Sequence, residues 1–158
     1  GGRGLFGDEI EYLHFDCEVN PFTGRPFFNE VVFYHVPSKT LLMTDTWWNY
    51  PSSDGVTNGQ LAAAVGGGGS DDNLGGWELA PDVGKIPLGS SLWKVGMDKV
   101  YRPFYMNLMV NEKEKFRQIV THLTDVWEPE TLIPAHGDIV RGKAFIRDTL
   151  RAHFGVSD

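Results

Sequence analysis

The chain has 158 residues, of which 41% are hydrophobic and 13% aromatic, and its formal net charge is −7 at pH 7. A chain of this length buries roughly two thirds of its unfolded surface as one domain, so we expect a single domain over residues 1–158. The negative charge argues against nucleic acid or an anionic membrane surface as the main partner. The single cysteine excludes an intramolecular disulfide and a cysteine-based zinc site. No apolar run is long enough to span a membrane.

The N-terminal part of the chain predicts one strand at residues 10–19, followed by a turn at residues 21–26. Because side chains alternate along a strand, the sequence predicts two faces. One face would carry Ile10, Tyr12 and His14, and the other Leu13, Phe15 and Cys17.

Two uncharged apolar runs, at residues 31–34 and 40–44, form the centre of the predicted fold. Neither alternates cleanly between apolar and polar residues, so we expect two strands with both faces buried, as inside a layered α/β sheet. The short link between them, which contains Pro37, predicts a β-hairpin. Asp45 closes the second run, where a carboxylate either takes part in chemistry or caps a turn.

Residues 52–91 differ from the rest of the chain because glycine and acidic residues dominate them. The run at residues 62–72 contains four consecutive glycines, and ordering them would cost much conformational entropy. We therefore expect a flexible, Gly-rich acidic insertion within the domain. The segment is either a natural loop or an engineered linker, and its remaining residues favour the natural loop.

An apolar and aromatic segment follows at residues 92–110, and its large side chains cannot all be solvated. Gly96 and Pro103 predict that it breaks into short helical pieces, which we expect to lie over the sheet. Docking to another protein is an alternative use of the same apolar surface.

Helical periodicity is clearest at residues 112–127 and 143–154. Asn111 and Glu114 have the spacing of a capping pair at the start of the first of these helices. Gly155 lies just past the second, where a glycine commonly ends a helix.

Two features together resemble the C-terminal half of a metallo-β-lactamase-type domain. The first is the hairpin that ends on Asp45, and the second is a short buried strand at residues 131–134 that leads into His136. In that superfamily, the second half supplies a strand-end aspartate and a final histidine as metal ligands. The resemblance therefore implies an α/β fold that forms half of an αββα sandwich, with a mixed sheet and helices on one face.

A closer resemblance links residues 29–45 (NEVVFYHVPSKTLLMTD) to a family of unknown function from cyanobacteria and plastids. Its members share the apolar strand, the Ser-Lys-Thr-Leu turn, the strand-end Asp and a later Ala-His segment, here residues 135–136. The match covers residues 10–49 and 93–154 and implies a chloroplast location.

The chain departs from the superfamily pattern in two places. The first metal cluster, His-x-His-x-Asp-His, is absent from these residues, and residues 24–30 lack the histidine expected before the hairpin. The resemblance also implies a further N-terminal half before Gly1. Asp45 and His136 are thus the only superfamily metal positions retained.

A hydrolytic zinc site needs three or four protein ligands and an open position for water. Two ligands do not hold zinc tightly, so we interpret Asp45 and His136 as a vestigial metal site and expect no cofactor. In this interpretation Asp45 caps the loop after its strand and His136 hydrogen-bonds neighbouring backbone. Zinc or another divalent metal is expected only if a missing half or a partner chain completes the site.

The other histidines and the cysteine predict ordinary structural roles. His35 is expected to satisfy its turn, His122 to be solvated, and His153 to be partly protonated near the end of the last helix. The acidic neighbours of Cys17 should raise its thiol pKa and argue against a nucleophile.

Three aromatic residues follow the strand that ends on Asp45, namely Trp47, Trp48 and Tyr50. They suit three uses: lining a ligand pocket, covering the end of the sheet, or contacting a partner. Covering the sheet end and contacting a partner are the favoured interpretations.

Two functions are favoured by these observations, and a small-ligand binder that uses the aromatic residues at 47–50 is a third, weaker possibility. The favoured hypothesis is a non-catalytic scaffold or interaction subunit, set in a plastid complex, with a partner protein or a second copy covering an exposed sheet face. The alternative is a metallohydrolase of a small ester, thioester or phosphoester whose metal site is completed by a missing half or a partner.

Overall fold

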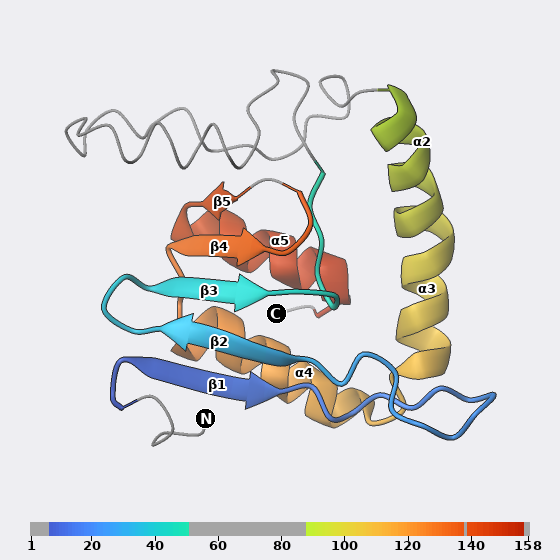
Figure 1. The fold of residues 1–158 in the computed structure, drawn as a ribbon, viewed down its shortest axis with the longest axis horizontal. Coiled ribbons are helices and arrows are strands. Elements are labelled where there is room, and N and C mark those ends of the chain that lie inside the picture. The colour runs from blue at the N-terminus through green and yellow to red at the C-terminus, as the bar shows by residue number, and fades with distance from the viewer. Residues whose placement is uncertain (1–6, 51–87, 138, 157–158) are drawn as a thin grey trace.

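In the computed structural model of the chain, residues 7–50, 88–137 and 139–156 are described. Within these ranges the chain forms one five-stranded sheet with the order β1-β2-β3-β4-β5 (Figure 1). The strands are β1 (Ile10–His14), β2 (Val31–His35), β3 (Thr40–Met43), β4 (Thr131–Pro134) and β5 (Val140–Arg141).

The first three strands form an antiparallel meander, in which the predicted hairpin is β2–β3, with Phe33 opposite Leu42. The chain returns to the sheet as β4, which lies parallel to β3 with Met43 opposite Pro134. β5 closes the edge in antiparallel orientation. The sheet is therefore mixed, and the predicted α/β class is confirmed.

The two faces of this sheet differ in what covers them. Two helices, α4 (Lys113–Thr121) and α5 (Lys143–Phe154), lie behind the sheet in Figure 1 and pack against one face. On the other face Val31 is 37% exposed and Leu42 is 41% exposed. The prediction of two buried faces is therefore wrong for the described part of the chain. The uncharged strands suggested burial on both sides, but the helices supply only one covering layer.

The core lies between the sheet and these two helices. Phe15 is fully buried there, and its ring centroid lies 5.3 Å from that of Phe116 and 6.1 Å from that of Phe154. β1 ends at His14 and is shorter than predicted, although the Phe15 N–H still donates to the Glu30 carbonyl at 2.8 Å. Of the two predicted faces, the one that carries Phe15 and Cys17 faces the core, since both residues are 0% exposed.

Residues 88–109 form one continuous helical arm that crosses the ends of the strands (Figure 1). The prediction of broken pieces lying over the sheet is therefore wrong. Gly96 keeps helical angles, with φ −60° and ψ −47°, and Pro103 follows the π-helical segment η3, so the arm accommodates its missing N–H by a local change of helix type. The segments of the arm are α2 (Leu88–Gly96), the π-helical η3 (Met97–Tyr101), α3 (Arg102–Phe104) and the π-helical η4 (Tyr105–Met109).

Burial changes along this arm. Trp93 is 65% exposed and Val100 is 69% exposed, whereas Tyr105 and Met109 are buried in the core. The arm starts at Leu88, so the last four residues of the predicted insertion at 52–91 are helical. The rest of that insertion lies outside the described residues.

The remaining helices match their predicted ranges. α4 continues through the π-helical η5 (His122–Val126), but the predicted capping pair is wrong, because Glu112 is the N-cap residue and no side chain caps the helix. α5 ends as predicted at Gly155, whose φ of 65° lies in the left-handed region. None of the helices in the described ranges is long and apolar enough to cross a membrane, which agrees with the sequence.

Candidate functional site

The candidate site lies where the parallel strands β3 and β4 end at the same edge of the sheet. Beyond the strands the two chain segments remain joined, because Ala135 N–H donates to the Met43 carbonyl at 2.9 Å and Asn49 N–H donates to the His136 carbonyl at 3.0 Å. Ligands of α/β proteins commonly bind beyond the carboxyl ends of parallel strands. The topology thus brings Asp45 and His136 together across 91 residues of sequence.

Gly137 allows these two segments to approach closely. Its φ is +87°, and a Cβ built on it would lie 2.3 Å from the carbonyl carbon and oxygen of Asn49. Any side chain there would push the segment after β3 away from the segment after β4. The glycine of the Ala-His-Gly sequence is therefore required by packing.

The loop after β3 is capped by a carboxylate that the sequence did not single out. Glu30 is only 6% exposed, and its carboxylate accepts from the N–H groups of Thr44, Asp45 (3.0 Å) and Thr46 (2.7 Å), and from the Thr46 hydroxyl. A buried carboxylate is tolerated when its oxygens accept several hydrogen bonds. The prediction that Asp45 itself caps this loop is therefore wrong. In the sequence, the only indication of this role was that Glu30 is a single charged residue directly before an uncharged strand.

Asp45 is consequently free to face the pocket. Its Oδ1 lies 3.3 Å from Nε2 of His136, and the two side chains are 55% and 64% exposed. The predicted partner of His136 was neighbouring backbone, whereas the structure places its imidazole against the Asp45 carboxylate. A carboxylate beside an imidazole can orient the ring and exchange protons with a bound molecule.

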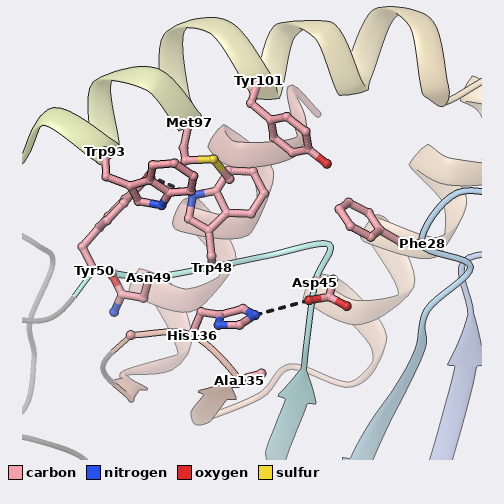
Figure 2. A pocket seen from close by; sticks show the side chains of 11 residues that line it. Phe28, Asp45, Trp48, Asn49, Tyr50, Trp93, Met97, Tyr101, Ala135 and His136 are labelled. Carbon is pink, nitrogen blue, oxygen red and sulfur yellow. Dashed lines mark hydrogen bonds and ion pairs between the residues drawn. The ribbon is translucent and has the colours of Figure 1, made fainter. Parts of the chain in front are cut away.

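Aromatic side chains form the walls above this pair (Figure 2). They enclose a cavity of about 560 Å³ between the helical arm and the two strand ends, a volume within the usual range for small-molecule pockets. The apolar members of the lining are Phe28, Trp48, Tyr50, Trp93, Met97 and Tyr101.

A chain of hydrogen bonds fixes one wall of this cavity. Trp48 Nε1 donates to the Tyr50 hydroxyl at 2.8 Å, which in turn donates to Asp98 Oδ1 at 3.0 Å. Lys94 pairs with the same carboxylate from one turn earlier on the arm. Burial, followed by the bond to Asp98, raises the pKa of Tyr50 well above its usual value. The segment after β3 that carries Trp48 and Tyr50 is thereby anchored to η3.

A second buried carboxylate fixes the opposite wall. Glu18 is 2% exposed and accepts from the Tyr105 hydroxyl at 2.5 Å and from the Phe28 N–H at 3.1 Å. Burial raises the pKa of Glu18 despite these bonds. From the sequence, Glu18 counted only as an acidic neighbour of Cys17. Its structural role was missed because its hydrogen-bond partner Tyr105 is 87 residues away in the chain.

The aromatic residues after β3 divide between two roles. Trp47 is buried in the main core, whereas Trp48 and Tyr50 are buried beneath the arm and line the cavity. Covering the end of the sheet, one favoured interpretation, is thus correct for Trp47. Pocket lining, the less favoured one, holds for Trp48 and Tyr50.

The other singled-out residues lie away from the Asp45–His136 pair. His35 bonds Ser38 within its turn at 2.6 Å, as predicted. The solvated role predicted for His122 is wrong, because its ring packs edge-on against Trp127 and burial lowers its pKa. Burial first, and then the acidic neighbour Glu18, raise the pKa of the Cys17 thiol to about 12, so the prediction of an inert cysteine agrees with the structure.

His153 also differs from its prediction. It is 8% exposed and packs edge-on against Trp48, with ring centroids 4.7 Å apart. Burial lowers its pKa to about 4, so the imidazole is neutral at pH 7 instead of partly protonated. His153 therefore supports the aromatic wall from behind as an uncharged ring.

Asp45 and His136 do not by themselves make a metal centre. In the described ranges, no group of three or more His, Cys, Asp or Glu side chains is arranged to hold an ion. The pair offers one oxygen ligand and one nitrogen ligand, fewer than zinc requires.

Comparison of the chain with protein-family models, curated proteins and solved structures finds no match. The site is therefore interpreted from its own chemistry.

Proposed function

We propose that the chain is a non-catalytic interaction subunit that forms one layer of a larger assembly, with a partner polypeptide covering the open face of its sheet. The observation that carries this proposal is a row of apolar side chains across four strands. In the strand registers, Tyr12 is opposite Phe33, Phe33 is opposite Leu42, and Leu42 is opposite Ile133.

The open face has the character of a layer interface. Val31 and Leu42 are its most exposed apolar residues, at 37% and 41%. Covering ~400 Å² of such apolar surface would contribute on the order of 10 kcal/mol before the costs of association. That is comparable to the whole stability of a typical domain, so covering this face would strongly favour a complex.

Charge on the open face indicates a partner of different sequence. The chain carries a net charge of −7, yet the strand residues on this face include no carboxylate and place His14, His35 and Arg141 around the apolar row. Glu11 instead points to the helix side, where it accepts from Trp127 Nε1 at 2.7 Å. A partner with an apolar centre and a carboxylate facing Arg141 complements this face, whereas the same strand residues of a second copy would offer that arginine no carboxylate. On the resemblance alone, we propose a plastid complex as the setting.

Light scattering coupled to size-exclusion chromatography tests this proposal with the whole chain. We expect concentration-dependent association and binding of anilinonaphthalene sulfonate, both reduced in Leu42→Lys. Phe22→Lys is the matched control, because Phe22 is 78% exposed in a loop away from the sheet, and it should change neither signal. A stable monodisperse monomer that binds no dye would contradict the proposal, and a discrete dimer would identify a second copy as the occupant.

A metallohydrolase of a small ester, thioester or phosphoester is the second candidate. It is favoured by one observation, the 3.3 Å approach of His136 to Asp45 inside a cavity. Because the residues present fit only half of a metal site, the candidate requires further ligands from a missing half or from a partner chain. Zinc titration calorimetry of the isolated chain tests it. Weak binding lost in both Asp45→Ala and His136→Ala would support the candidate, and binding unchanged in both variants would exclude these ligands.

A further inference from the structure

We propose that the aromatic cavity beside Asp45 binds an organic ammonium cation of about the size of choline. The cavity combines aromatic side chains with one exposed carboxylate, and quaternary ammonium groups are recognised by this combination. This inference is independent of the open sheet face and concerns the other edge of the molecule.

The charge of the lining favours a cation. Among the described residues that line the cavity, Asp45 is the only carboxylate, and no lysine or arginine is present. The Asp45 carboxylate, which has the His136 imidazole 3.3 Å from one of its oxygens, would repel an anion and attract a cation across a partly desolvated space. A second carboxyl group, that of Glu18, lies behind the wall that Phe28 forms, where it accepts from the Phe28 N–H at 3.1 Å.

The pKa of Tyr101 responds to the acidic groups around the cavity. Burial first, and then the charges of Glu18 and Asp45, raise its pKa to about 12. Its ring lies 5.8 Å from that of Trp48 and 6.5 Å from that of Phe28, so it joins the two walls. A group inside the cavity would therefore face aromatic rings on several sides and Asp45 at the base, as Figure 2 shows.

The protein already places an ammonium group on this aromatic wall. Lys94 Nζ lies 4.5 Å from the centroid of the Tyr50 ring and pairs with Asp98. A cation held by an aromatic ring and a carboxylate is thus present beside the cavity. Asp45 and the neighbouring rings offer the same pair of interactions to a ligand within it.

A charge-matched pair of probes tests the proposal on the whole chain. Choline and dimethylbutanol have the same shape, but a carbon atom replaces the ammonium nitrogen in the second. Trp48 and Trp93 lie in the cavity, so tryptophan fluorescence and titration calorimetry both report binding. We expect choline to bind about tenfold more tightly than dimethylbutanol. Equal affinity for the two probes, tighter binding of the anion dimethylbutyrate, or no binding of choline would overturn the proposal.

Two variants localise the binding. Asp45→Asn should weaken choline about tenfold through the lost charge and leave dimethylbutanol unchanged, while Asp148→Asn removes a charge from the exposed side of α5 and should have no effect. Trp93→Leu should weaken choline about threefold, whereas Leu92→Ala on the same arm should not. Trp93 and Leu92 are 65% and 71% exposed, so neither change should unfold the chain. Choline affinity unchanged in both Asp45→Asn and Trp93→Leu would exclude this cavity.

Discussion

The two faces of the sheet carry similar side chains in different surroundings. Leu41 and Leu42 are adjacent in β3, yet Leu41 is fully buried under the helices and Leu42 is 41% exposed on the open face. The same alternation holds in β2, where Val32 is buried and Val31 is exposed. Apolar composition alone therefore does not identify the core of this protein, because a covering layer is also needed.

The carboxylates at the end of β3 repeat this contrast. Glu30 lies under the loop and accepts four hydrogen bonds, whereas Asp45 lies above it and is 55% exposed. Glu30 therefore supports the structure, while Asp45 is available to a bound molecule.

The largest expected effect separates the two leucines. Leu41→Ala should lower the free energy of unfolding by about 3 kcal/mol, because it leaves a cavity in the core. Leu42→Ala should lower it by less than about 1 kcal/mol, since its side chain is 41% exposed and its removal leaves no enclosed cavity. Urea denaturation measures both, and equal losses would show that the open face is packed in solution.

The second test separates the two carboxylates. Glu30→Gln should cost about 2 kcal/mol, because the neutral amide offers only one oxygen acceptor to four donors. Asp45→Asn should change stability by less than about 0.5 kcal/mol, as is usual for an exposed polar residue. Chemical denaturation again provides the measurement. A larger loss for Asp45→Asn would mean that Asp45 holds the loop after all.

The smallest expected effect concerns acid stability on the covered side. Burial lowers the pKa of His153 from its usual value of 6.5 to about 4 in the folded state, so the unfolded chain takes up a proton first as the pH falls. Its contribution to stability is complete above about pH 7.5 and decreases by about 1.4 kcal/mol on going down to about pH 5.5. The raised pKa of Glu18 acts in the opposite direction.

The variant His153→Asn isolates this contribution, because asparagine does not titrate. Its free energy of unfolding should depend less on pH than that of the unchanged chain, whatever its absolute stability. His14→Asn serves as the control, since His14 is exposed at the end of β1. A pH dependence that is the same in all three proteins would show that His153 is not held neutral by burial.

Local patterns predicted most of the secondary structure. The hairpin β2–β3, the strand β4 and the helix α5, which Gly155 caps, agree with their predicted positions. These features depend on alternation, helical periodicity and glycine geometry within a few residues. The arm at residues 88–109 was mispredicted, because Gly96 and Pro103 weaken a helix only where the surrounding turns cannot accommodate them.

The candidate site was predictable only in part. Asp45 was singled out because it ends a strand, His136 from the family resemblance, and Trp48 and Tyr50 because they follow the strand that ends on Asp45. Glu30 and Glu18 were missed as supporting residues, because their partners lie 14 to 16 and 10 to 87 residues away. The only local signal for Glu30 was its position directly before an uncharged strand, and nothing in the residues around Glu18 distinguishes it from a solvated carboxylate.

By itself, the sequence determined that this chain folds as an α/β sheet with two amphipathic helices, since periodicity and turn residues act over short distances. Only the tertiary structure decided which sheet face stays open, which carboxylate caps the loop after β3, and that Asp45 meets His136 under an aromatic wall. Those outcomes depend on contacts between residues far apart in the chain, where the free energy of burial outweighs local preference.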